Sequence, residues 1–179
     1  MVVTRVVFET HSWSEDNEQG RASGWHDCDL SPRGRDLAAE LGARRRADGL
    51  EVVLVSDLRR ARETAEIAFA GSDLPLLHDW RLRECDYGDL NGSAVAIVRN
   101  AVEGPYDRFP GGETWAEAVT RVGAVLDDVT GRWPGARVLI VGHMSSYWAL
   151  EHRCHGLPLA SIGQPFDWQL GWEYDLAAP

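Results

Sequence analysis

Apolar and polar positions alternate along the chain in blocks that predict strands separated by helices. Short, nearly continuous apolar runs are typical of buried strands, and an apolar residue at every second position is typical of a strand with one exposed side. Buried strands are predicted at Val2–Glu9, Glu51–Val55, Leu74–Leu77 and Arg137–Val141. A half-exposed strand is predicted at Trp168–Leu176, where Trp168, Leu170, Trp172, Tyr174 and Leu176 alternate with polar residues and glycine.

Between these strands, apolar residues recur at the three- to four-residue spacing of helices. Ser31-Pro32 forms a helix start, with the helix ending before Asp48-Gly49, and Thr114 with Glu117 forms a capping box for a helix that ends at Trp133. Further helices are predicted at Leu58–Phe69, capped by Ser56 or Asp57, at Ala94–Val102 and at Ser145–His155, and the rest of Asp79–Gly112 is predicted to be loop, where a lid would lie. The pattern predicts one three-layer α/β domain over residues 1–179, with a mostly parallel central sheet, helices on both faces and an antiparallel edge strand.

Composition narrows the possible partners. The formal net charge is −10, which disfavours nucleic acid because the phosphate backbone would be repelled. The sequence contains neither an apolar run of membrane-spanning length nor a signal-peptide pattern, so no membrane partner is expected. The three cysteines, Cys28, Cys85 and Cys154, are odd in number and widely spaced, which favours a reducing compartment, and we expect a cytoplasmic protein.

Two histidines suggest the chemistry. His11 follows the first predicted strand and His143 follows the strand at Arg137–Val141. A histidine alone is more often structural, but the carboxyl ends of parallel strands share one crevice in which ligands bind. Together with Arg60 and Glu84, the pair would suit phosphoryl transfer: a neutral imidazole attacks phosphorus, cations stabilise the phosphoryl oxygens, and a protonated carboxyl group serves the leaving alcohol.

Five segments, in order, resemble the histidine phosphatase superfamily, which includes the phosphoglycerate mutases. They are Asn17–Arg21 with Gly24-Trp25 and Leu30–Arg35, then Ser56–Ala65, Leu82–Gly92, Pro110–Thr114 and Val141–His143, and the resemblance extends from about Val2 to Leu157. It implies that His11 is the phosphorylated nucleophile and Glu84 the acid and base. It also implies that Arg60, His143 and Asn17 surround the phosphoryl group of a small phosphorylated metabolite, with no metal or other cofactor.

The chain departs from the family signature beside both histidines. The family has arginine before its nucleophile and glycine after it, whereas this chain has Thr10 and Ser12, whose hydroxyl and main-chain donors are the expected replacements. Because a charge-assisted hydrogen bond contributes about 1.5–3 kcal/mol, loss of that arginine predicts weakened phosphate binding. Met144 replaces the glycine that commonly follows the second histidine, and we expect it to narrow the entrance.

The resemblance leaves three functions open, and a different reaction of the altered pocket on a phosphorylated or carboxylated metabolite is a further alternative. The family's mutases carry an insertion that this chain lacks between Gly92 and Gly111, which favours a phosphomonoester hydrolase over a mutase-type phosphotransferase. A phospho-ligand binding protein without turnover is the third interpretation, and a homodimer is left open. His152, Cys154 and His155 lie within one helical turn, but without a partner cluster they do not predict a zinc site.

Overall fold

The central element is a five-stranded sheet with the strand order β4-β3-β6-β1-β7. The computed structural model describes residues 2–164 and 169–178. The strands are β1 (Val3–Thr10), β3 (Val52–Val55), β4 (Leu76–His78), β6 (Arg137–Gly142) and β7 (Trp172–Ala177). Neighbouring strands are parallel except at the edge, where β7 runs antiparallel to β1. The mostly parallel sheet with an antiparallel edge strand is therefore confirmed.

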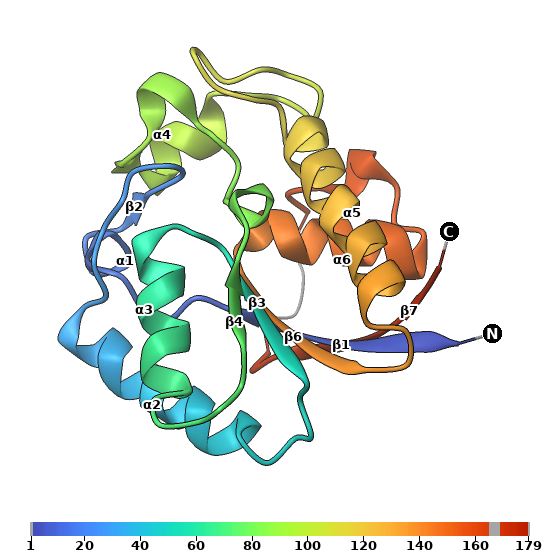
Figure 1. Cartoon of the computed structure of the whole chain (residues 1–179). Coiled ribbons are helices and arrows are strands. Elements are labelled where there is room, and N and C mark those ends of the chain that lie inside the picture. The colour runs from blue at the N-terminus through green and yellow to red at the C-terminus, as the bar shows by residue number, and fades with distance from the viewer. Residues whose placement is uncertain (1, 165–168, 179) are drawn as a thin grey trace.

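Helices cover both faces of this sheet and complete the three layers. Helices α2 (Pro32–Arg45) and α3 (Arg59–Ala68) pack on one face, and α5 (Trp115–Arg132) and α6 (Met144–His155) pack on the other (Figure 1). The alternation of β1 explains both contacts, because Val7 joins the core under α2 and α3 while Val6 and Phe8 join the core under α5 and α6. Within the described part of the chain, no helix combines the length and the apolar character needed to cross a membrane.

Short elements gather beyond the carboxyl end of β1 (Figure 1). They are α1 (Glu15–Glu18), the paired strands β2 (Arg21–Ala22) and β5 (Ser93–Ala94), and α4 (Val95–Asn100). Three single turns of 3-10 helix, at Trp80–Leu82, Gly88–Leu90 and Leu159–Ser161, complete the connections. Helix α4 ends two residues before the predicted Val102, and the rest of the predicted loop region is irregular as expected.

Two predicted boundaries are wrong, one for a local reason and one because of a contact from a distant segment. The last strand begins at Trp172, because Leu170 is exposed and Gly171 has a φ of 82°, which breaks the extended backbone; the predicted first residue, Trp168, lies outside the described residues. The N-cap of α3 is Leu58, without a side-chain cap. An aspartate from another segment, Asp27, instead accepts the Arg59 N–H at 2.6 Å.

Candidate active site

The two predicted histidines meet where β1 and β6 end. Thr10 lies opposite Gly142 in the parallel register, and the His11 main-chain N–H donates to the Gly142 carbonyl at 2.9 Å. The ring centroids of His11 and His143 are 5.0 Å apart. Both rings line a cavity of about 540 Å³, a volume within the range of small-molecule sites. Strand order thus brings together side chains that are 132 positions apart in the sequence.

The environment of His11 sets its tautomer and its charge. Nδ1 lies 2.7 Å from the Ser12 carbonyl oxygen, which can only accept, so Nδ1 carries the proton and donates it. Nε2 therefore carries no proton, and its lone pair accepts a hydrogen bond from the Arg60 Nε–H at 3.3 Å. Burial, with the Arg60 guanidinium beside the ring, lowers the pKa of His11 to about 3, although the bond to Ser12 opposes that shift. The ring is consequently neutral at pH 7 and has the form that a nucleophile requires.

Arg60 lies between the two rings and is held by main-chain carbonyls. Its guanidinium donates to the carbonyls of Gly24 at 2.8 Å and His26 at 3.1 Å, and its Nε lies 3.3 Å from Nε2 of His11. Its Nη2 lies 3.4 Å from Nδ1 of His143. Because the side chain is 1% exposed, its charge acts in a poorly solvated place. This arginine is a fixed cation at the centre of the candidate site.

His143 is buried against Ser56, the residue that directly follows the neighbouring strand β3. Its Nε2 lies 2.8 Å from the Ser56 hydroxyl, and burial together with Arg60 holds the pKa of His143 well below its ordinary value. The Ser56 hydroxyl also accepts from the Leu58 N–H at 3.4 Å. Because the Arg60 guanidinium can only donate to Nδ1, the ring carries its proton on Nε2, and the Ser56 hydroxyl accepts it and fixes the ring orientation.

Glu84 approaches the same cavity from the loop region. Its Oε1 accepts the N–H groups of Cys85 at 2.9 Å and Ser145 at 3.1 Å, and its Oε2 accepts the Met144 N–H at 3.1 Å. Met144 and Ser145 form the first turn of α6, so the carboxyl group lies at a helix N-terminus. Burial nevertheless raises the pKa of Glu84, although these N–H groups and Arg60 favour the ionised form. The Glu84 carboxyl group thus retains its proton more readily than a carboxyl group in water does.

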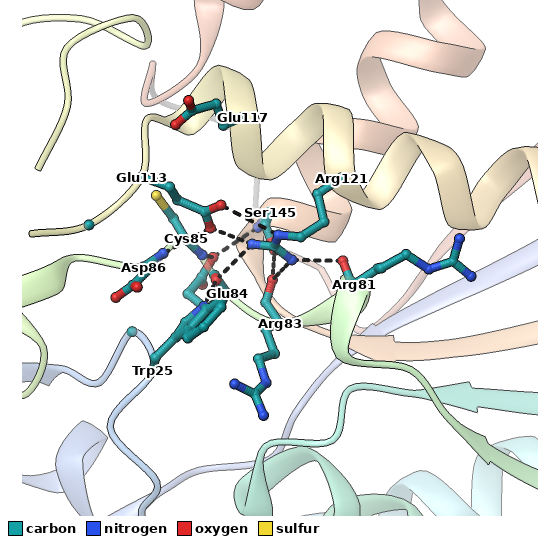
Figure 2. A network of polar contacts seen from close by, with 12 residues as sticks. Trp25, Arg81, Arg83, Glu84, Cys85, Asp86, Glu113, Glu117, Arg121 and Ser145 are labelled. Atoms are coloured by element: carbon teal, nitrogen blue, oxygen red, sulfur yellow. Dashed lines mark hydrogen bonds and ion pairs between the residues drawn. The ribbon is translucent and has the colours of Figure 1, made fainter.

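The backbone that carries Glu84 is held by a polar network (Figure 2). Trp25 donates from its indole N–H to the Glu84 carbonyl at 2.7 Å. Arg121 on α5 forms an ion pair with Glu113. The Arg121 guanidinium also donates to three main-chain carbonyls of the loop, those of Arg81, Arg83 and Glu84. Helix α5 therefore sets the position of the loop without contacting the cavity through this arginine.

Three more predicted residues line the cavity, and one does not. Thr10, Asn17 and Met144 are in its wall. Asn17 also braces the chain, because its side-chain oxygen accepts the Ser14 N–H at 3.0 Å; its amide N–H groups remain as donors. Ser12 faces away: its hydroxyl donates to the Gly34 carbonyl at 2.7 Å and its N–H to Thr64 at 2.8 Å. The expectation that Ser12 replaces the phosphate contact of the missing arginine therefore fails, since its donors are occupied.

Comparison with known proteins identifies the family. A family model described as the histidine phosphatase superfamily (branch 1) matches residues 7–168. The chain belongs to the histidine phosphatase superfamily. It is 32% identical over 163 residues to a probable phosphoglycerate mutase GpmB of Salmonella typhi, covering 86% of this chain and 76% of that protein.

Solved structures share the fold of this superfamily member. YhfR of Bacillus stearothermophilus superposes with a TM-score of 0.82 at 30% identity, over 90% of this chain and 85% of that one. A mycobacterial glucosyl-3-phosphoglycerate phosphatase, solved in complex with VO3, superposes with a TM-score of 0.79 at 27% identity, over 88% of this chain and 84% of that one. Proteins named as phosphatases and as mutases are thus both similar to this chain.

Sequence reasoning missed residues that position the site of this superfamily member. Ser56 directly follows β3, which is parallel to the strand before His143, so the rule that singled out the histidines also applies to Ser56. The Gly24 carbonyl that holds Arg60 has no side-chain signal, but Gly24 itself has a φ of 54°, a conformation that favours glycine. Arg121 lay on the polar side of a predicted helix and was not distinguished from other surface arginines.

Proposed function

We propose that this protein hydrolyses phosphomonoesters in two steps through a phosphorylated His11, without a metal. The observation that carries the proposal is the arrangement around Nε2 of His11, which carries no proton because Nδ1 donates to Ser12, and whose lone pair accepts a hydrogen bond from Arg60. Arg60 and His143 lie beside that nitrogen, and Glu84 lines the same cavity. A neutral nucleophile, a fixed cation and a carboxyl group with a raised pKa are the parts that phosphoryl transfer to histidine requires.

In the first step, Nε2 attacks the phosphorus and the bond from phosphorus to the ester oxygen breaks. Arg60 stabilises the negative charge on the phosphoryl oxygens, and Asn17 adds side-chain N–H donors. Nδ1 of His143 accepts from Arg60 and its Nε2–H donates to the Ser56 hydroxyl, so this neutral ring holds the guanidinium beside the phosphoryl group. Glu84 gives its proton to the departing alkoxide oxygen, so the alcohol leaves neutral and the carboxylate remains.

In the second step, water attacks the phosphohistidine. The Glu84 carboxylate takes a proton from that water while the bond between Nε2 and phosphorus breaks, and inorganic phosphate is released. Oε1 of Glu84 already accepts two N–H groups whereas Oε2 accepts one, so Oε2 is the oxygen with room for the transferred proton. The two steps restore both His11 and Glu84 to their starting forms.

Because Thr10 stands where the family signature has arginine, we expect this protein to bind phosphate more weakly than proteins that carry the signature. The Thr10 side chain carries no charge, and Arg60 is the buried cation among the described residues that line the cavity. One charge-assisted contact fewer corresponds to a loss of about tenfold to a hundredfold in transition-state binding. In this proposal hydrolysis survives such a loss, because His11, Glu84 and Arg60 supply the nucleophile, the acid and the central cation.

Phosphate release from a panel of phosphomonoesters tests the proposal. We expect turnover of at least one member, and we expect His11→Ala to lower the rate more than a thousandfold, because no other group is placed to attack. Rapid acid-free quenching with a radiolabelled phosphoryl donor should label the unmodified protein at His11. His152→Ala, at an exposed position on α6, is the matched control and should retain full turnover and labelling.

Other results would point to the other two functions. If no panel member is hydrolysed and His11 is not labelled, while phosphorylated ligands raise the melting temperature, the protein binds phospho-ligands without turnover and the proposal is wrong. If the label passes to a second hydroxyl of the ligand rather than to water, the protein is a phosphotransferase.

A further inference from the structure

The cavity continues well beyond the phosphate-binding end, and its extension has an apolar wall. One side of the extension, called the lid side here, is formed by α4 and the loop that follows it. It contributes Val95 and Val98 of α4, with Val102 and Phe109 after the helix. The opposite side contributes Trp148 of α6 and Ile162. At about 540 Å³ the whole space exceeds what a phosphoryl group alone needs, so most of it faces the organic part of a ligand.

Charged groups in the extension are confined to its exposed rim. Arg99 and Glu103 are exposed residues on the lid side. Arg21 is also exposed, and its guanidinium donates to Gln19 at 3.1 Å and to the Gly92 carbonyl at 3.0 Å. Of the arginines that line the cavity within the described chain, Arg60 alone is buried, and it belongs to the phosphate end. The inner wall therefore offers no buried cation for a second anionic group.

Met144 adds to the apolar character at the junction of the two ends. It follows His143 directly and lines the cavity, and its side chain packs against the core that contains Trp148. A thioether is flexible and polarisable, so it adapts to aromatic and aliphatic surfaces alike. The leaving group of a bound phosphomonoester would lie against this side chain on its way into the extension.

We propose that the preferred substrates are phosphomonoesters of bulky apolar alcohols, and that compact acidic phosphomonoesters are poor substrates. This inference rests on the proposed hydrolase function. Each methylene that an apolar leaving group buries improves binding about fourfold. Three such groups therefore offset about sixtyfold, which is comparable to the loss expected from Thr10 in place of arginine. Binding of the remote part of the substrate would compensate for a weaker phosphate contact.

Two substrates of opposite character test the inference. We expect kcat/KM for 1-naphthyl phosphate to exceed that for 3-phosphoglycerate by about a hundredfold or more. Comparable values, or a preference for 3-phosphoglycerate, would overturn the substrate class while leaving hydrolysis intact. If neither ester is hydrolysed and His11 is not labelled, the hydrolase function fails, and the inference fails with it.

Isosteric variants test which wall of the cavity is responsible for the preference for apolar leaving groups. Val95→Thr with Val102→Thr replaces two methyl groups of the lid wall by hydroxyls of the same shape, and Val95 is 39% exposed, so folding is expected to persist. The ratio of kcat/KM for 1-naphthyl phosphate to that for 3-phosphoglycerate should fall about tenfold. The control is Ile97→Thr, on the same helix, 56% exposed and outside the cavity wall, which should keep the original ratio. An unchanged ratio in the double variant would contradict the assigned wall.

Discussion

At the scale of single residues, Thr10 distinguishes this site from the family signature. It ends β1 directly before the nucleophile and lines the cavity, so a longer side chain there would extend toward the phosphate end. The neighbouring Ser12 cannot compensate, because its hydroxyl and N–H are both engaged elsewhere. Arg60 is therefore the cation on which phosphate binding depends. A substitution at position 10 is the direct way to change the strength of that binding.

Thr10→Arg should strengthen a weak phosphatase. A second cation beside the phosphoryl group adds a charge-assisted hydrogen bond, so kcat/KM for a good phosphomonoester should rise about tenfold or more. Steady-state kinetics on the same ester measure the change. Thr10→Met supplies similar length without charge and should leave kcat/KM unchanged or lower. If the arginine variant is as slow as the methionine variant, the cavity is adapted to its threonine and charge at this position is not limiting.

The sequence could predict which side chains meet, but not how each is held. His11 and His143 follow from strand ends, and Arg60 and Glu84 follow from motifs that resemble a family. Ser12 was assigned to the ligand on its position alone, and only the fold shows that Gly34 accepts its hydroxyl hydrogen. Main-chain contacts leave no trace in residue identity, because any residue supplies the carbonyl groups that hold a guanidinium.

At the scale of elements, local signals predicted helices better than they predicted boundaries set by distant contacts. The capping box of Thr114 and Glu117 begins α5 as expected, with the Glu117 N–H donating to the Thr114 hydroxyl at 3.0 Å. The start of α3 could not be predicted in this way, because its cap comes from Asp27, 32 positions earlier. Asp57, one of the two predicted caps, instead pairs with Arg83 at 2.7 Å.

Helix α5 should control catalysis through the loop that carries Glu84. Arg121→Met removes the donor to the three loop carbonyls and leaves Glu113 without its partner (Figure 2). We expect kcat to fall about tenfold or more with little change in KM, because the acid is displaced while the phosphate contacts remain. The pH profile of kcat should also shift, since it reports the ionisation of the carboxyl group in the complex.

The matched control for this variant lies on the same helix. Arg132→Met removes an exposed guanidinium near the end of α5, and its kcat and pH profile should match those of the unmodified protein. Loss of stability alone would lower the active fraction of the Arg121 variant without moving its pH profile. An unshifted profile, with kcat reduced only in proportion to folded protein, would therefore contradict a positioning role.

At the scale of the whole molecule, the ionisation of the catalytic groups is coupled to the free energy of folding. His11, Arg60, Glu84 and His143 come from four separate segments and are brought together only in the folded chain. Arg60 and His143 are each 1% exposed, so folding moves one charge and one titratable ring out of water. A group whose pKa differs between the folded and unfolded states makes stability depend on pH.

Acidification from pH 7 to pH 5 should therefore destabilise the protein through its buried histidines. In the unfolded chain His11 takes up a proton near its ordinary pKa of 6.5, whereas in the folded chain burial and Arg60 lower its pKa to about 3. The unfolded state thus binds more protons across this range, and stability falls as the pH falls, by about 2 kcal/mol for His11 alone. The lowered pKa of His143 acts in the same direction, while the raised pKa of Glu84 opposes both.

Urea denaturation at the two pH values, in the unmodified chain and in His11→Gln, isolates the contribution of one ring. Both chains keep Glu84 and His143, so the difference between them reports His11. The variant should lose about 2 kcal/mol less unfolding free energy between pH 7 and pH 5. His152→Gln, which removes an exposed ring on α6, should lose as much as the unmodified chain. An equal loss in His11→Gln would mean that the His11 ring takes up its proton as readily in the folded chain as in water, and burial beside Arg60 would then not be what keeps the ring neutral.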